Sequence, residues 1–418
     1  MKRVRKDGIG VAEPRTVHLL GAGASRDAGL PVSMELTQRI GELIQADEPF
    51  EPSPYGYDPP VGPLTQAYYA AIANIQAGDA YRGRPPGGVD IERLFTTIQM
   101  LATASDLEIA PFVQQWREPF PSRSDMSEWS WFIEEALRYS RSMREGRQET
   151  FGNSGPPAPS VSETYCKLCE VVHEKLKSAL TPESESAHDY LTGLFQSRPT
   201  RIATLNYDIG VENTSANAEL LVDTGIENWK GGMSWEWSGD ADVRLLKLHG
   251  SIDWGYPWVE GGGAPEGAPR MTNREDDDYF LYDGLGRDLQ PVGLVFGLRG
   301  KLRPDGPFLA MLAEFWNWLL EADRLIVVGY SFGDEHINTL VEDWIESREG
   351  SILEVVDPGV PNSRFDCSGS TPYFIRAALE YKNHESTGCP GYPRGWGSAR
   401  PNFEFHRAKV AEWIESRS

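Results

Sequence analysis

Two short polar segments, far apart in the sequence, carry the residues best suited to chemistry. Residues 204–208 read Thr-Leu-Asn-Tyr-Asp, and residues 247–251 read Lys-Leu-His-Gly-Ser. Each follows an apolar run with the character of a β-strand. Because ligands bind at the carboxyl ends of the strands in an open parallel sheet, the sequence predicts that both segments line one polar site.

Asn206, Asp208 and His249 are the side chains that this site would use. A lone Asn or His at a strand end is usually structural, but together an amide can orient a water and an imidazole, which titrates at about pH 6.5, can act as a general base. Among the seven histidines, His249 has the most suitable setting, since Gly250 leaves one side of its ring open. We therefore predict Asn206 and His249 as catalytic residues, with Asp208 in the same polar group.

A glycine turn follows the first apolar strand. Residues 21–25 read Gly-Ala-Gly-Ala-Ser. Glycines let the backbone approach a pyrophosphate, and the amides of the following turn can bind it. The motif lacks the full dinucleotide spacing and the acidic residue about 20 positions on, so a tight strand–helix turn is the alternative. The predicted nucleotide contacts in this turn are Gly21, Ala22, Gly23 and Ser25.

Two later strand ends resemble the first in chemistry. Residues 325–328 form an apolar run that breaks into a turn with Gly329 and Ser331, which suits a second phosphate or ribose contact, or a plain connection capped by Ser331. Asp357 ends the next strand, where an acidic residue often holds a ribose hydroxyl, although an Asp-Pro turn is the alternative. His336 is interpreted as a capping or packing residue. Together the motifs indicate a dinucleotide, NAD, and chemistry on it.

Strands and helices alternate along much of the chain. Strand character at residues 16–20, 201–208, 243–248, 324–329, 352–356 and 403–406 predicts an α/β fold with a doubly wound parallel sheet. Helices are predicted at residues 34–44, 64–75, 91–104, 128–139, 162–179, 188–196 and 334–346, and a terminal helix after the strand at 403–406. Residues 1–15 are expected to form a flexible basic tail. Residues 16–59 and 199–418 are expected to form an NAD-binding domain, and residues 60–198 a helical module inserted into it.

Composition excludes several classes of protein. The net charge of −22, from 62 acidic and 40 basic residues, would repel phosphate, so we expect no direct nucleic-acid binding. No apolar run approaches the roughly 18 residues of a membrane helix, so we expect no membrane segment. The basic start is not followed by the apolar core of a signal peptide, so we expect a cytoplasmic protein.

The four cysteines raise the question of a metal. Cys166 and Cys169 have the spacing of metal ligands, but Cys367 and Cys389 do not form a second close pair. The first pair lies in a predicted amphipathic helix, which favours buried structural thiols. We therefore expect no zinc and predict no metal ligands.

In the order and spacing of these motifs, together with Asp-Ile-Glu at residues 90–92, the chain resembles the sirtuin superfamily, and more closely its bacterial sirtuin-like branch of anti-phage defence. The resemblance extends over residues 16–358, with the helical insert matched loosely. It implies a Rossmann-like, sirtuin-type fold. Asn206 would position the water or ribose, His249 would be the general base, Asp208 would contact the nicotinamide end, and the turns at Gly21 and Gly329 would hold the phosphates and the adenosine ribose.

Two departures from the protein deacylases of that superfamily bear on the activity. Residues 251–290 contain no cysteine, where those enzymes carry a four-cysteine zinc module. Residues 296–298 read Phe-Gly-Leu, where they carry Phe-Gly-Glu. Both changes remove parts that grip an acylated peptide. The resemblance therefore implies an NAD glycohydrolase (NADase), with NAD as its substrate. The alternatives are an NAD-dependent deacylase or ADP-ribosyltransferase, and a non-catalytic module that senses NAD or ADP-ribose.

An NADase that depletes host NAD would need a gate. The sequence carries no recognisable sensor domain after the catalytic core, and members of the family are gated by sensor domains, partners or assembly. The resemblance implies a HerA-type ATPase or a phage-derived trigger as partner, and assembly into a homo-oligomer. The large, tryptophan-bearing helical insert is the expected interface.

Overall fold

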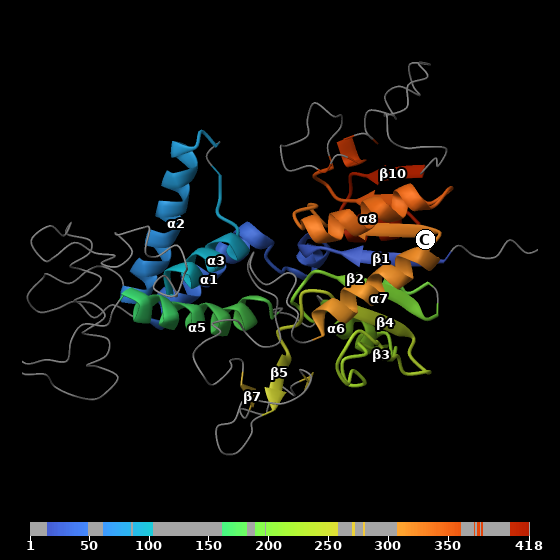
Figure 1. The fold of residues 1–418 in the computed structure, drawn as a ribbon, viewed down its shortest axis with the longest axis horizontal. Coiled ribbons are helices and arrows are strands. Elements are labelled where there is room, and N and C mark those ends of the chain that lie inside the picture. The colour runs from blue at the N-terminus through green and yellow to red at the C-terminus, as the bar shows by residue number, and fades with distance from the viewer. Residues whose placement is uncertain are drawn as a thin grey trace, which may run out of the picture.

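A computed structural model describes residues 15–48, 62–84, 87–102, 161–181, 189–196, 198–257, 270–271, 279–280, 307–360, 372, 374–376, 378 and 402–417. Figure 1 shows two bodies side by side, a group of helices and a sheet with its own covering helices. The predicted basic tail, apart from Arg15, and the helix predicted at residues 128–139 lie outside the described residues.

The sheet has seven strands in the order β10-β9-β8-β1-β2-β4-β3. All of its pairings are parallel, which confirms the predicted doubly wound α/β fold. The strands are β1 (Thr16–Leu20), β2 (Thr200–Thr204), β3 (Val222–Asp223), β4 (Val243–Lys247), β8 (Arg324–Val328), β9 (Ile352–Val356) and β10 (Asn402–His406). Strand β2 ends at Thr204, earlier than predicted, so Asn206 and Asp208 lie in the loop that follows it.

Both faces of the sheet are covered, which is why the central strands β1 and β8 are mostly apolar rather than alternating. On one face, Leu19 and Val327 belong to a core that includes α7 (Phe308–Glu321) and α8 (Glu335–Ser347). On the other, Leu20 and Val328 belong to a core with α6 (Gly210–Asn217) and α10 (Val410–Glu415). Adjacent residues of one strand therefore serve opposite cores, as the alternation of strand side chains requires.

The second body is a helical module with a core of its own. Its helices are α1 (Ser33–Asp47), α2 (Pro63–Tyr81), α3 (Ile91–Ala102) and α5 (Val161–Ala179). Side chains at helical spacing, such as Leu36, Ile40 and Ile44 of α1, bury themselves against Phe95 of α3 and Leu168 of α5. Helix α1 thus packs with the module, although it follows directly from the turn after β1. The exact division into domains stays a prediction.

Some elements differ from the prediction. The helix predicted over residues 188–196 is wrong over the part that the structure describes, where only a 3-10 turn, η6 (Thr192–Leu194), forms. Leu191 and Leu194 are drawn into the core beneath the sheet, and a Cβ at Gly193 would lie 2.1 Å from Ile414. Helices α6 and α7 are absent from the prediction. A small antiparallel sheet also forms, from β5 (Trp254–Pro257), β6 (Arg270–Met271) and β7 (Tyr279–Phe280).

The strand order reverses between β1 and β8, because the chain runs outward from β1 to β2 and β4 before it returns to β8 on the other side. Such a reversal is where ligands bind in open α/β sheets. Here the turns after β1 and β8 touch backbone to backbone. Gly21 N donates to Val328 O (2.9 Å) and Gly23 N donates to Gly329 O (2.8 Å). Gly329 has φ +61°, and a Cβ there would lie 2.1 Å from Ala24 N.

We expect Gly329→Ala to destabilise the protein well beyond a matched control. Alanine at a left-handed φ costs about 1–2 kcal/mol, and forcing a methyl group into a packed contact adds about 1–3 kcal/mol. Gly350→Ala is the control, because Gly350 has φ +77° but nothing within 4 Å of an added Cβ. Urea unfolding measures both variants. Equal losses of unfolding free energy would show that the two turns do not depend on their close contact.

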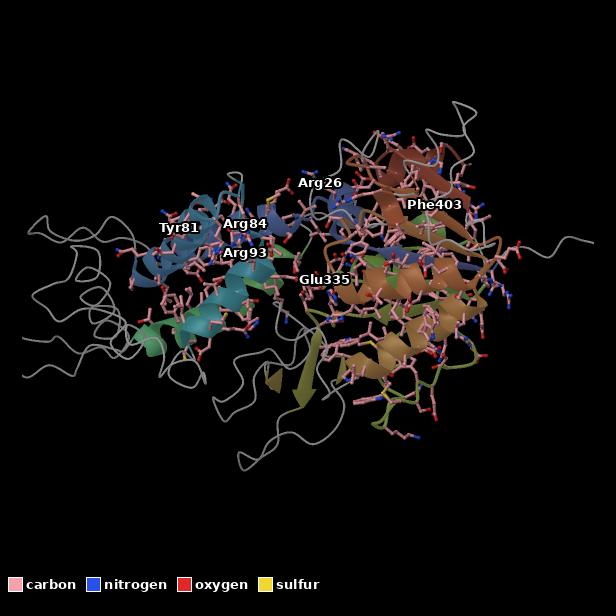
Figure 2. All side chains as sticks on the ribbon, turned by 45° about the horizontal axis from the view of Figure 1, so that its top comes forward. Arg26, Tyr81, Arg84, Arg93, Glu335 and Phe403 are labelled. Atoms are coloured by element: carbon pink, nitrogen blue, oxygen red, sulfur yellow. The ribbon has the colours of Figure 1, made fainter. Side chains whose placement is uncertain are left out.

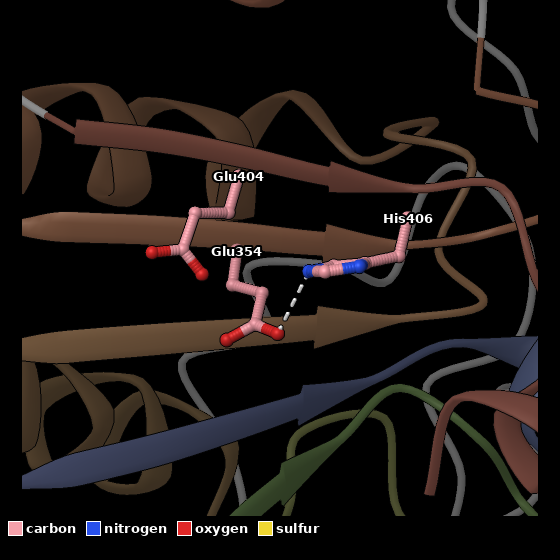
Figure 3. Close-up of side chains that lie close together, drawn as sticks. All are labelled: Glu354, Glu404 and His406. Carbon is pink, nitrogen blue, oxygen red and sulfur yellow. Dashed lines mark ion pairs between the residues drawn. The ribbon is translucent and has the colours of Figure 1, made fainter. Parts of the chain in front are cut away.

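A buried carboxylate, Glu354, holds the edge of the sheet and the C-terminal helix. Figure 3 shows it with Glu404 and His406. Glu354 in β9 is fully buried, and its carboxylate accepts from Arg324 (2.5 Å), Trp413 Nε1 (3.1 Å) and Arg417 (3.0 Å), while His406 Nε2 lies 3.0 Å away. Glu354, Glu404 and His406 are close enough together to hold a metal ion. Two guanidinium groups already neutralise Glu354, however, which favours a structural ion network over a metal site.

Glu354→Ala should lower the unfolding free energy by about 3–5 kcal/mol, since it leaves Arg324 without its buried counter-ion. Glu404→Ala is the control: Glu404 also pairs with Arg324, at 3.1 Å, but its side chain is 40% exposed. An exposed pair of this kind contributes about 0–1 kcal/mol. If chemical denaturation gave the two variants the same stability, Glu354 would not anchor the C-terminal segment.

Candidate functional site

The turn after β1 and the loop after β2 are joined through Asn206. Its Nδ2 donates to Gly21 O (2.9 Å) and to Ser25 Oγ (3.0 Å), and all three residues are buried. Because a backbone carbonyl can only accept, this contact fixes the orientation of the amide. Both Nδ2 hydrogens are used, so Oδ1 is the amide atom left for a ligand or water. That is the atom needed to accept a hydrogen bond from a water molecule.

Asp208 completes this network and is itself fully engaged. Its Oδ2 accepts from Ser25 Oγ (2.8 Å), and its Oδ1 accepts from Gly210 N (2.8 Å) at the start of α6. Its backbone carbonyl accepts from Lys247 Nζ (2.6 Å), a buried ammonium that also pairs with Glu212 (2.8 Å). Asp208 therefore holds the loop in shape, and its predicted contact with nicotinamide stays a prediction.

His249 lies at the end of the neighbouring strand, β4, and pairs with Asp334. The distance from His249 Nε2 to Asp334 Oδ2 is 3.0 Å, and the two residues are 6% and 4% exposed. The other ring nitrogen, Nδ1, is buried and has no hydrogen-bond partner in the described part of the chain. Backbone hydrogen bonds tie the loops of β2 and β4 together, from Leu248 N to Thr204 O and from Ile252 N to Tyr207 O, each 2.9 Å.

The residues predicted to contact phosphate lie in two turns, one after β1 and one after β8. The amides of Gly21 and Gly23 donate to the β8 turn, so these glycines serve the close approach of two turns and have no N–H free for a phosphate. Ser331 is exposed, and the cap of α8 is Asp334, whose Oδ1 accepts from the amides of residues 336 and 337. His336 is exposed and takes part through its backbone alone. Ser331 is therefore open to solvent beside Gly329.

Asp357 forms the turn after β9. Its Oδ1 accepts from Gly359 N (2.6 Å), which is the Asp-Pro turn considered as an alternative. Burial raises the pKa of its carboxyl, against the opposing effects of the Gly359 amide and Arg26. Figure 2 shows Arg26, in the turn η1 (Ala22–Ala28), and Glu335 lying between the helical module and the sheet. A residue of the turn after β1 and the first residue of α8 therefore lie on the side toward the module.

Two site residues were missed by the reasoning on strand ends. Tyr207 and Ile252, from the loops that carry Asn206 and His249, are buried in the core of the helical module. Tyr207 OH donates to Glu92 Oε1 (3.0 Å) on α3, and burial together with that carboxylate raises the pKa of the Tyr207 phenol well above its usual value. The signal was present as the Asp-Ile-Glu motif at residues 90–92. The module is thus in direct contact with the site.

The cysteine pair packs inside the module. Cys169 is fully buried, and burial raises the pKa of its thiol, which disfavours the thiolate that zinc requires. Cys166 Sγ lies 3.9 Å from Ala102 O. Cys367, Cys389 and the Phe-Gly-Leu segment at residues 296–298 lie outside the described residues. The expected absence of zinc stays a prediction.

Among the described helices, none combines the length and apolarity needed to cross a bilayer.

Comparison with known proteins finds one match among protein families. Residues 200–358 match the family model described as a SIR2-like domain. No curated protein matches the chain. A Sir2 homologue in complex with NAD is similar at 12% identity and TM-score 0.38, over 96% of this chain and 86% of that one. A histidine-to-asparagine mutant of a Sir2 homologue bound to ADP-ribose is similar at 14% identity and TM-score 0.35, over 97% of this chain and 91% of that one.

The structure of Sir2Tm bound to a propionylated peptide is similar at 12% identity and TM-score 0.31, over 97% of this chain and 92% of that one. All three TM-scores lie below 0.5, so the assignment depends on the match in sequence. That match covers the loops that carry Asn206 and His249 and the turn that carries Ser331. Residues 200–358 are therefore similar to a SIR2-like domain.

Proposed function

We propose that this protein is an NAD glycohydrolase that cleaves NAD into nicotinamide and ADP-ribose. The observation that carries the proposal is that Asn206 and His249, at neighbouring strand ends, each have one polar atom that can accept a hydrogen bond or a proton. Asn206 donates with both Nδ2 hydrogens, so Oδ1 is the amide atom that can accept from a water. His249 has Nε2 beside Asp334, and its Nδ1 has no hydrogen-bond partner among the described residues. An acceptor that orients a water and a base that takes its proton are the two groups that hydrolysis needs. The SIR2-like domain supports NAD as the substrate.

The reaction follows from these two groups. The bond between the nicotinamide nitrogen and C1′ of the ribose breaks, and its electron pair neutralises the positive charge of the pyridinium ring. Water oxygen bonds to C1′ through an oxocarbenium-like state and loses one proton. Asn206 Oδ1 accepts a hydrogen bond from that water, and His249 Nδ1 takes the proton. A positioned base of this kind contributes about 10²–10⁴-fold to the rate.

The remaining predicted contacts would bind the rest of the nucleotide. Gly21, Ala22 and Gly23 have no side chain larger than a methyl group, so a pyrophosphate would approach the backbone of this turn. Ser25 links the turn to Asn206 and Asp208 by hydrogen bonds. On the other side of the strand reversal, the exposed Ser331 would offer its hydroxyl to the nucleotide. Gly329 would let the nucleotide approach the backbone closely. Asp357 retains Oδ2 for a ribose hydroxyl, since Oδ1 is engaged with Gly359. The proposal requires no zinc.

We expect His249→Ala and Asn206→Ala each to lower nicotinamide release by about 10²-fold or more. His336→Ala is the matched control, since His336 is exposed and contributes only its backbone amide to the same region. Asn206→Ala also removes two buried hydrogen bonds, so it should lose about 1–3 kcal/mol of stability that His336→Ala keeps. Chromatography of the products from purified protein and NAD measures the rates.

The same assay separates the rival activities. Free ADP-ribose together with nicotinamide supports hydrolysis. ADP-ribose attached to protein, or transferred to an acyl group, would support a transferase or a deacylase instead. NAD binding without nicotinamide release would leave a sensing module. Near-wild-type release by His249→Ala would remove that residue from the mechanism.

For the biological role, we propose a gated effector of anti-phage defence that acts by depleting NAD in the cytoplasm. Its partners would be further copies of this chain and a HerA-type ATPase or a phage-derived trigger. The support is the contact between module and site. Tyr207 and Ile252 belong to the loops of Asn206 and His249, yet their side chains are buried in the core of the helical module. A partner that shifts the module would therefore shift both loops.

Light scattering on the purified chain should give a particle larger than the 46.6 kDa monomer, with low nicotinamide release until a partner is added. The reason is that a free, fully active NADase would deplete its own cell. A strict monomer that is fully active alone would contradict both the assembly and the gate. An active oligomer would contradict the gate only.

A further inference from the structure

We propose that Asp334 is the positioning residue of His249. It fixes the imidazole in the tautomer that carries its proton on Nε2, and so leaves the lone pair of Nδ1 for the proton of the substrate. The use of that lone pair rests on the proposed hydrolysis of NAD. The tautomer itself depends only on the contact between the two side chains, and it can be measured without turnover.

The contact has the geometry of a strong, buried hydrogen bond. Asp334 Oδ2 and His249 Nε2 are 3.0 Å apart, and both side chains are more than nine-tenths buried. An ionised carboxylate can only accept, so Nε2 must carry the proton. A neutral imidazole carries one proton, so Nδ1 is then the acceptor. That atom is buried and has no hydrogen-bond partner among the described residues.

The charge of Asp334 is stabilised from its other side. Its Oδ1 caps helix α8 by accepting from the amides of His336 (2.9 Å) and Ile337 (3.4 Å). Amide donors and the positive end of a helix both favour the ionised form of a carboxylate. Capping uses Oδ1 alone, which leaves Oδ2 directed at His249. A role as helix cap therefore does not account for the contact with the imidazole.

The loop before Asp334 prevents that carboxylate from swinging away. Asp334 N donates to Tyr330 OH (2.9 Å), and that hydroxyl lies 3.1 Å from both Asp334 O and Asn338 Oδ1. Asn338 Nδ2 donates to the carbonyl of Phe332 (2.8 Å), a residue with φ +57°. A left-handed non-glycine residue persists only where its surroundings fix it. The loop is thus a rigid support for Asp334.

The two decisive variants are Asp334→Asn and Asp334→Ser. Both residues are good helix caps, so α8 should keep its start and the protein its fold. In Asp334→Asn, the cap uses Oδ1, and Nδ2 then donates to Nε2 of His249, which drives the proton to Nδ1. In Asp334→Ser, the single hydroxyl caps the helix and no group reaches the imidazole. Glu335→Gln, one position along and exposed, is the control.

The first measurement is nitrogen NMR of protein labelled with ¹⁵N-histidine, with the His249 signals assigned by their loss in His249→Gln. We expect the Nε2–H tautomer in the wild type and in Glu335→Gln, and the Nδ1–H tautomer in Asp334→Asn. The second is nicotinamide release, in which kcat should fall by about 10²–10⁴-fold in Asp334→Asn. KM should change little, because Asp334 does not touch the substrate.

The outcomes separate this inference from the proposed function. A wild-type His249 in the Nδ1–H tautomer, or a tautomer unchanged in Asp334→Asn, overturns the inference whatever the activity. The wild-type spectrum decides even if both variants fail to fold. A correct change of tautomer in a protein that releases no nicotinamide would support the Asp334–His249 pairing and remove the NADase. A change of tautomer with unchanged kcat would show that the pairing is structural.

Discussion

The arrangement of the site depends on how closely two turns approach each other. The amide of Gly23 reaches the carbonyl of Gly329 across the strand reversal, and no side chain fits between them. From the first turn, Ser25 reaches Asn206 and Asp208 in the loop after β2. The second turn leads to Asp334, which reaches His249 after β4. The two polar groups of the site therefore share one point of support.

The helical module supplies the other boundary. The loops after β2 and β4 carry the polar side chains of Asn206 and His249, while Tyr207 and Ile252 of the same loops are buried in the apolar core of the module. Burial of such side chains is worth about 1.5–3 kcal/mol each. The loops of Asn206 and His249 are consequently in contact with both the sheet and the module.

Much of the sheet could be read from the sequence, because strands that are buried on both faces leave apolar runs that end in polar residues. That pattern also brought out Asn206, Asp208 and His249 on the correct strand ends. The helix α7 was missed because its run from Phe308 to Glu321 is apolar on most sides, and the short helix α6 because it follows the loop of Asp208 without an apolar stripe.

Contacts between distant segments could not be predicted in this way. Periodicity places Asp334 at the start of a helix, where capping explains it, and nothing local indicates that its second oxygen meets a histidine far earlier in the chain. The same holds for Tyr207, which reads as part of a polar strand end but is buried among helices. Gly21 and Gly23 were predicted to let the backbone approach a pyrophosphate. In the structure, their amides instead approach the turn after β8 of the same chain.

The burial of Tyr207 and Ile252 in the module has a consequence for divergence within such proteins. A substitution in the interior of the module changes the packing around these two side chains, so it must be compatible with the loops that carry Asn206 and His249. The module and the sheet therefore cannot accept changes independently, and non-additive effects are expected between them. A graft of the module onto another sheet would have to carry both loops with it. The module and the loops of Asn206 and His249 are therefore expected to change together.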